Sequence, residues 1–326
     1  MLQMRIIAPG EHSDRIVELL CEDSAVSNVT LYRGASVKPD GDVIEADIAR
    51  EGANEVVDVL REMGIHRFGS IHLATVRTWI SESGLEADRV TPGASADAVV
   101  WAEVTQQAYE DSEFNWIFSS FMVLATVLVA IAIVIDSSIL LIGAMVLGPE
   151  FGAVAALGVA LVRRRFTLLR RAMTTLAGGF VLAIVATTIA TLIARWLGWV
   201  TAADVTESRP DTSFIYTPDK WSFIVALIAG VAGVLSLTSA RLGGLSGVFI
   251  SVTTIPAAGN VALGVAFGLR DEILGSGLQL VVNLFGMAIA GWMTLAVQQE
   301  VWASVSSYRA RLLAGRRHSN RPPSDR

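Results

Sequence analysis

Hydrophobic positions divide the chain into a mixed amino-terminal part and a long apolar part. Apolar and polar positions alternate over residues 1–113, which also hold most of the acidic residues, whereas residues 114–297 are almost free of charge. The apolar runs of the second part are each near the ~20 residues that a bilayer-spanning helix needs. This split predicts a soluble domain followed by an integral membrane domain.

The first part, residues 1–82, is predicted to form a small α+β domain. Strand-like alternation and helix-like apolar faces follow one another in the order strand, helix, strand, strand, helix, strand. The expected strands are 2–8, 29–37, 43–48 and 71–80, and the expected helices begin at Ser13 or Asp14 and at Asn54. This βαββαβ order is that of a ferredoxin-like fold, and it resembles the ACT and PII-like regulatory domains. The order of elements does not by itself assign a ligand.

Residues 83–113 are predicted to form a linker and an amphipathic helix, and residues 298–326 a basic polar tail. Gly, Pro, Ser and Asp occur over 81–94, whereas 95–112 place valines on one side and acids on the other. Aromatic rings such as that of Trp101 prefer the membrane interface. We therefore expect this helix to lie on the cytoplasmic membrane surface, with a merely packed helix as the alternative.

Six apolar segments are predicted to cross the membrane. They are 114–135, 138–161, 172–192, 222–240, 244–268 and 274–297. Basic residues gather between the second and third segments and after the last one, and the positive-inside rule places both regions in the cytoplasm. The topogenic residues between the segments are Arg163, Arg164, Arg165, Arg170 and Arg171. The prediction is a multi-pass inner-membrane protein with both termini in the cytoplasm.

The second apolar segment contains a proline and a carboxylate where the hydrocarbon is deepest. Its central residues include Gly148, Pro149, Glu150 and Gly152. Proline removes a helix hydrogen bond, and a charged side chain at the bilayer centre costs at least ~3 kcal/mol. Such a segment is expected to face protein or a wet cavity rather than lipid. It therefore predicts a broken helix that forms half of a membrane-embedded site.

A similar pattern in the fifth segment predicts an internal repeat. Pro-x-x-Gly followed by Ala-Leu-Gly-Val-Ala occurs at Pro149 and again at Pro256, where Gly259 is the matching glycine. A three-helix unit repeated in tandem inserts with opposite topologies, which gives the 3+3 inverted repeat of many transporters. The alternative is a chance match, because Gly, Ala and Val dominate membrane helices.

Polar side chains around the two prolines are the candidate substrate- or ion-binding residues. We expect Glu150 to be the coupling carboxylate, beside Asn260 and with Asn283 nearby. Thr253 and Thr254 complete the set. The alternative is that the amides only satisfy freed backbone groups and that Glu150 is protonated or paired with a helix end.

Composition argues against several other classes of function. The net charge is −6 and the soluble part has no Lys/Arg stripe, which argues against nucleic-acid binding. Cys21 is the sole cysteine, so an internal disulfide or a Cys-based metal site is excluded. No nucleophile–base pair or metal-ligand spacing occurs, so we expect no enzyme, no metal and no cofactor. The start lacks a long apolar h-region, and no cleavable signal peptide is expected.

Ile142-Gly143-Ala144-Met145 stands shortly before Pro149 and Gly152 in the second apolar segment. With this pattern the chain resembles domain-of-unknown-function family 389, a group of uncharacterised hydrophobic membrane proteins. The resemblance continues through Arg209-Pro210, the Pro256 segment and Asn283, and covers roughly residues 114–297.

The chain departs from the family pattern at two positions. Ala153 stands where a second proline is expected, and Glu150 stands where many members have an apolar residue. We therefore expect Glu150 to mark a branch rather than to serve the whole family. The resemblance implies a membrane protein without an established activity.

The sequence supports two functional hypotheses. The first is a transporter or channel for an ion or small solute, with its site at two broken helices near the midplane. The second is a non-transporting membrane sensor or scaffold whose cytoplasmic domain binds a ligand or partner. Membrane lipid and a second copy of the chain are the expected partners, because ferredoxin-like modules often associate through their sheets.

Overall fold

The computed structural model describes residues 1–76, 78–93, 98–206, 220–239 and 246–319. The chain divides into two compact units. The first unit comprises Met1–Glu103, Thr238–Ala240 and Gln298–Arg326, and the second comprises Val104–Leu237 and Arg241–Val297. Each unit is described separately below.

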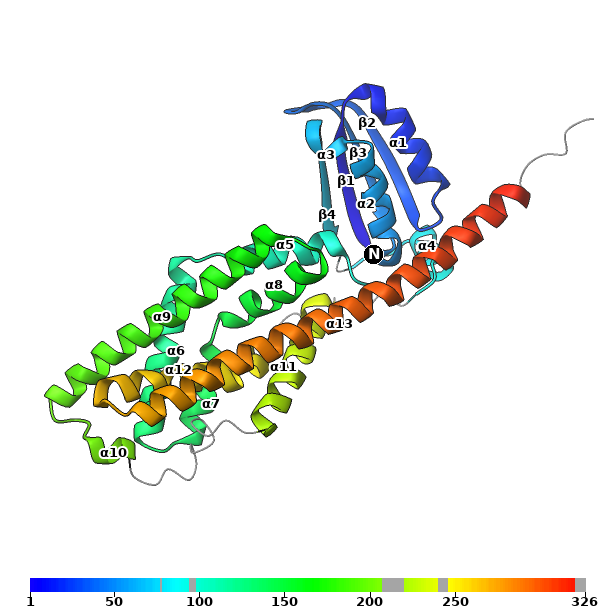
Figure 1. The fold of residues 1–326 in the computed structure, drawn as a ribbon. Helices are drawn as coiled ribbons and strands as arrows, with labels where there is room; N and C mark the ends of the chain where they lie inside the picture. The colour runs from blue at the N-terminus through cyan, green and yellow to red at the C-terminus, as the bar shows by residue number, and fades with distance from the viewer. Residues whose placement is uncertain (77, 94–97, 207–219, 240–245, 320–326) are drawn as a thin grey trace, which may run out of the picture. The chain divides into compact units, whose positions relative to one another are not determined.

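The first unit contains a four-stranded antiparallel sheet with the predicted element order (Figure 1). Its elements are β1 (Leu2–Ala8), α1 (Gly10–Glu22), β2 (Val26–Val37), β3 (Asp40–Ile48), the 3-10 turn η1 (Arg50–Gly52), α2 (Ala53–Glu62), α3 (Ile65–Phe68) and β4 (Ser70–Thr75). The strands are ordered β2-β3-β1-β4, and each neighbouring pair is antiparallel. In a ferredoxin-like fold the two βαβ units interleave, so that β3 and β1 lie in the centre of the sheet and β2 and β4 at its edges.

The period-two pattern of β1 explains how this sheet acquires a core. Met4 and Ile6 are fully buried, whereas the residues between them face outward. Ile16 of α1 and Leu60 of α2 pack into the same cluster. Both helices therefore cover one face of the sheet, as side chains of alternating orientation require.

Three local predictions in this unit are wrong. α1 begins at Gly10, directly after Pro9, and the Ser13 hydroxyl donates to the Pro9 carbonyl at 3.5 Å, so neither Ser13 nor Asp14 caps the helix. The last strand ends at Thr75. The expected linker contains a helix, α4 (Glu82–Val90), because the Ser81 hydroxyl accepts a hydrogen bond from the Gly84 amide at 3.1 Å.

Two side chains fix the segment that precedes α5 (Trp101–Asp111), which is shorter than the helix predicted over 95–112. The buried Arg50 pairs with Glu103 at 2.7 Å and donates to the Ala98 carbonyl. The Asn54 amide donates to the Val99 carbonyl at 2.7 Å and accepts from the Trp101 amide at 3.0 Å. The bond from the Trp101 amide satisfies one of the N–H groups that a helix start leaves open, and the other bonds fix the residues before it.

Glu51 makes the stability of this unit depend on pH. Burial raises the pKa of its carboxyl group, and the charge of Asp88 acts in the same direction. A carboxyl whose pKa is higher in the folded state binds protons more tightly there. The destabilisation of the folded unit by ionised Glu51 is therefore absent at low pH. It grows as the pH rises from the pKa of Glu51 in the unfolded state through its pKa in the folded state.

Replacing Glu51 with glutamine should therefore stabilise the first unit at neutral pH, by a few degrees in Tm at most (about 2–4 °C). The change should also flatten the dependence of stability on pH. Hydrogen exchange of β1 and α2 in the full-length protein between pH 5 and 8 measures both effects. Glu62→Gln, on the exposed side of α2, is the matched control. Equal behaviour of the two variants would contradict the prediction.

The second unit is helical. Its elements are α6 (Trp116–Val134), α7 (Ser138–Leu147), α8 (Glu150–Val162), α9 (Phe166–Trp196), α10 (Ala202–Thr206), α11 (Lys220–Thr238), α12 (Ser246–Phe267) and α13 (Arg270–Ser319), of which α13 continues into the first unit. Among the described residues, three stretches are long and apolar enough to cross a membrane: Trp116–Val134, Phe166–Trp196 and Arg270–Trp302. The bent pair α7–α8 gives a fourth if it counts as one span. The six predicted spans are not confirmed.

α12 differs from the prediction of a second broken helix. It runs without interruption from Ser246 to Phe267 and contains Pro256 in its interior. The predicted breaks at Pro256 and Gly259 are therefore wrong. Proline is tolerated inside apolar helices where neighbouring helices satisfy the freed backbone group. Because only one half of the unit has a broken helix, the inverted repeat is not confirmed.

Glycines let the helices of this unit approach closely. A Cβ atom added to Gly259 of α12 would lie 2.9 Å from the Cβ atom of Val129 in α6. A Cβ atom on Gly158 of α8 would lie 3.1 Å from the carbonyl carbon of Gly291 in α13. At Gly158 the backbones of α8 and α13 are thus in direct contact, as is common where small residues face each other in membrane helices.

The end of α5 and the two residues after it lie along the first turns of α9 through three polar contacts. Tyr109 and Thr167 are hydrogen bonded at 3.1 Å, and Arg171 pairs with Glu113 at 3.0 Å. The Thr175 hydroxyl donates to the Ser112 carbonyl at 2.7 Å. Of the predicted topogenic residues, Arg171 therefore also holds α5 in place. The structure places the others between α8 and α9 (Arg163, Arg164, Arg165) and in the second turn of α9 (Arg170).

Candidate functional site

The candidate site begins where α7 ends and α8 starts. α7 stops at Leu147, and α8 starts at Glu150 at an angle of 55° to it. Between them lie Gly148, in an extended conformation, and Pro149. Proline has no amide hydrogen to continue the helical ladder, which explains why the helix stops here. The sequence predicts the break at Gly148, Pro149 and Gly152, and the prediction is wrong for Gly152, which lies inside α8.

Glu150 is fully buried at the first position of α8. Its Oε1 atom accepts a hydrogen bond of 2.7 Å from the hydroxyl of Thr254, which is itself fully buried in α12. The amino end of a helix carries a partial positive charge that favours a nearby carboxylate. Thr254 belongs to the predicted set, whereas the side chain of Thr253 lies outside the described residues.

Asn260 has different neighbours from those predicted. Its amide donates to Glu272 and, at 2.8 Å, to the hydroxyl of Ser276, both near the start of α13. Thr254 and Asn260 are separated by about 9 Å along the α12 axis and about 120° around it. The structure therefore pairs Glu150 with Thr254 and Asn260 with α13, instead of placing Glu150 beside Asn260. Asn283 is fully buried in α13.

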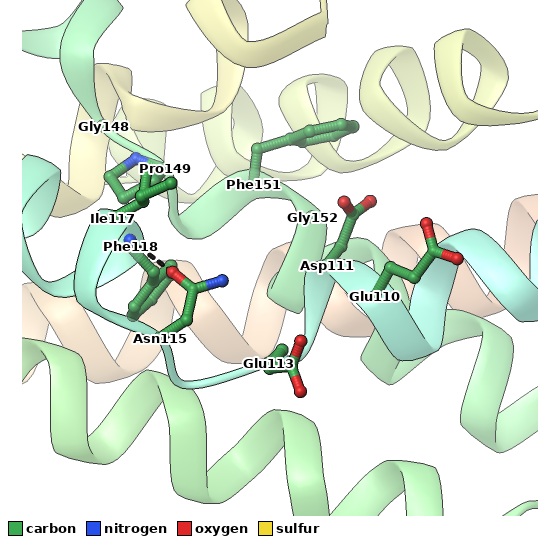
Figure 2. A pocket seen from close by; sticks show the side chains of 10 residues that line it. All are labelled: Glu110, Asp111, Glu113, Asn115, Ile117, Phe118, Gly148, Pro149, Phe151 and Gly152. Atoms are coloured by element: carbon green, nitrogen blue, oxygen red, sulfur yellow. Dashed lines mark hydrogen bonds between the residues drawn. The ribbon is translucent and has the colours of Figure 1, made fainter.

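A pocket of about 340 Å³ lies against the break (Figure 2). The residues that line it are Glu110, Asp111, Glu113, Asn115, Ile117, Phe118, Gly148, Pro149, Phe151 and Gly152. Three of them are acidic and come from the end of α5 and the turn that follows. The pocket therefore brings charged groups to the residues that flank the break.

Asp111 explains why residue 152 is a glycine. A Cβ atom at Gly152 would lie 2.7 Å from the Cγ atom of Asp111, whose carboxyl group points toward the first turn of α8 (Figure 2). Burial raises the pKa of Asp111, and a hydrogen bond from Gln107 opposes this effect. Sequence reasoning placed Asp111 on the polar side of a surface helix and missed this contact. Gly152, a glycine in the first turn of α8, was the feature of the sequence that could have indicated a close neighbour.

The described residues include no group of three or more His, Cys, Asp or Glu placed to hold a metal ion. The polar groups of the site are instead carboxylate, hydroxyl and amide side chains inside an apolar bundle. Such groups can bind a cation or a polar solute through oxygen atoms, or hold a proton on a carboxylate.

Apolar helices of spanning length and a proline break with a buried carboxylate are features of a helical membrane protein. The family model described as "Domain of unknown function (DUF389)" matches residues 145–289, which confirms the resemblance found in the sequence. An uncharacterized protein of Methanocaldococcus jannaschii is 24% identical over 169 residues. This match covers 52% of the chain and 50% of the archaeal protein, so the chain spans about half the length of that relative. No solved structure matches the chain.

Proposed function

We propose that this protein is a transporter or channel for an ion or small solute, with its binding site at the break between α7 and α8. The observation that carries the proposal is the complete burial of Glu150 at the start of α8 within an apolar bundle. A charged group at such a depth costs at least ~3 kcal/mol. A purely structural helix start could use an uncharged cap at far lower cost.

Two further features of the second unit support this proposal. The pocket beside Gly148 and Pro149 gives a solute a way to reach the residues that flank Glu150. The hydroxyl of Thr254 gives the site a ligand from a second helix. Binding groups contributed by different helices can separate when those helices move, as alternating access requires.

The expected setting is the inner membrane, with both termini in the cytoplasm and no enzymatic activity. The arginines between α8 and α9 support this orientation by the positive-inside rule and would attract anionic lipid. We also propose a homo-oligomer, because ferredoxin-like sheets commonly associate with one another.

Flux measurements in liposomes test the proposal. The purified full-length protein should catalyse movement of an ion or small solute, and Glu150→Gln should lower the rate at least tenfold. The control is Asp271→Asn, which removes an exposed carboxyl in the first turn of α13. Equal rates for the two variants would remove Glu150 from the site.

The small antiparallel sheet favours a second candidate, a membrane sensor or scaffold. The face of β1 opposite the helices carries Gln3 and Arg5, both exposed, and Arg5 lies 3.9 Å from Glu45. A protein without flux for any tested solute, but with a ligand or partner bound at this face, would support that function instead.

A further inference from the structure

Four polar residues form a stripe along one side of α13. They are Glu272, Ser276, Gln279 and Asn283. Spacings of four, three and four residues place them within about 60° of one another around the helix. Ser276 and Asn283 are fully buried and Gln279 is 3% exposed, whereas Glu272 is half-buried at the helix start. Buried polar groups are costly in an apolar bundle, so a row of them calls for an explanation.

The first two members of this stripe, Glu272 and Ser276, face α12, which runs antiparallel to α13. Asn260 is hydrogen bonded to Ser276, and a Cβ atom on Gly264 would lie 3.4 Å from the Cβ atom of Glu272. A step of four residues forward in α12 is thus matched by four residues backward in α13. Continued toward the start of α12, the same register places Thr254 level with Val282, one residue before Asn283.

Along the helix axes, the register places the two polar regions of the second unit at the two ends of the stripe, while Thr254 and Asn260 lie about 120° apart around α12. Thr254 holds Glu150 at one end, and Asn260 contacts Glu272 at the other. Asn283 and Glu272 are separated by about 16 Å along α13, roughly half of a ~30 Å hydrocarbon layer. The other three members of the stripe, Ser276, Gln279 and Asn283, are uncharged hydroxyl and amide groups.

We infer that this stripe is the path of a dehydrated monovalent metal cation, of the Na⁺ or K⁺ class, between Glu150 and Glu272. Amide and hydroxyl oxygens can replace the water ligands of such a cation, as carbonyl oxygens do in selectivity filters. Asn and Gln amides do not titrate, which disfavours a proton relay along the same row. One carboxylate at each end also suits a single charge better than Ca²⁺, whose sites combine several carboxylates. The inference rests on the proposed transport function and adds the class of ion and the route.

The decisive variants change the stripe while keeping its shape. Gln279→Met removes the amide but has a similar length, and Glu272→Gln removes a charge without changing size. The matched control is Gln298→Met on the same helix, since Gln298 lies off the stripe and is hydrogen bonded to Thr238 at 3.1 Å. We expect at least a tenfold loss of Na⁺ or K⁺ flux into liposomes for both stripe variants and less than a twofold change for the control.

Binding to the detergent-solubilised full-length protein provides a second readout. A cation that binds only the folded state raises Tm as its concentration increases. NaCl or KCl, exchanged for choline chloride at constant ionic strength, should raise the Tm of the wild type and of Gln298→Met but not of Gln279→Met. A melting curve of each variant also shows whether it is folded.

The outcomes separate this inference from the proposed function. Wild-type liposomes that move no solute at all would overturn the proposed function. Flux that depends on Glu150 but is unchanged in Gln279→Met and Glu272→Gln would leave the proposed function standing and overturn the path. Flux of protons or an uncharged solute without Na⁺ or K⁺ flux would overturn the path in the same way.

Discussion

Replacing Gly259 with leucine should destabilise the helical unit by about 3 kcal/mol or more. An added Cβ atom would overlap Val129 Cγ1 and would lie 3.4 Å from the Thr126 carbonyl, both in α6. The Cβ atom of Val129, 2.9 Å away, does not move when the Val129 side chain turns, so rotating that side chain cannot relieve the overlap. The variant should therefore force α6 and α12 apart along their contact.

Thermal unfolding of the full-length protein in detergent measures this effect. Gly277→Leu is the matched control, because an added Cβ atom there meets no heavy atom within 4 Å. A large drop in Tm is expected only for Gly259→Leu. Equal drops would show that the loss comes from changing a helix glycine and not from the contact with α6.

Replacing Gly69 with alanine should have a comparable effect on the first unit. A Cβ atom at Gly69 would overlap the carbonyl oxygen of Ile7 and would lie 3.0 Å from its carbonyl carbon. Ile7 pairs with Ser70 in the ladder between β1 and β4, so its carbonyl cannot move without disturbing that ladder. We expect a loss of about 3 kcal/mol, at the upper end for single substitutions.

Hydrogen exchange of β1 in the full-length protein is the measurement for Gly69→Ala. Protection of β1 should fall, whereas Gly10→Ala should leave it unchanged, since a Cβ atom there would lie 3.7 Å from the Asp42 carboxylate. Unchanged protection in Gly69→Ala would show that the start of β4 has room that the structure does not indicate.

The small sheet was predictable because strand alternation is local. Met4 and Ile6 face the core with period two, and the turn residues between strands fix the order of pairing. The helix after Ser81 was missed because the residues around it are typical of a linker. Ser81, which caps this helix, was the residue that could have indicated the helix start.

The prolines show what local reasoning about the membrane part cannot decide. Pro149 ends a helix, whereas Pro256 lies within one, although both occur in the same sequence pattern. The difference depends on the neighbouring helices, which the pattern does not contain. Glu150 and Thr254 were predictable because buried polar groups are rare in apolar segments. The role of Glu272 was missed because it lies at the end of its segment, although its spacing to Ser276 could have indicated a shared face.

The contact between Gly158 and Gly291 has a mechanical consequence for α8. Gly158 lies eight residues after Glu150, which is about 12 Å along the helix. Because no side chain lies between the two backbones there to give way, a tilt of α8 against α13 would pivot near Gly158, with Glu150 at the other end of the helix. A swing on the order of 10° would displace Glu150 by roughly 2 Å. That displacement is enough to part it from Thr254, now 2.7 Å away, without any loss of the helix's own hydrogen bonds.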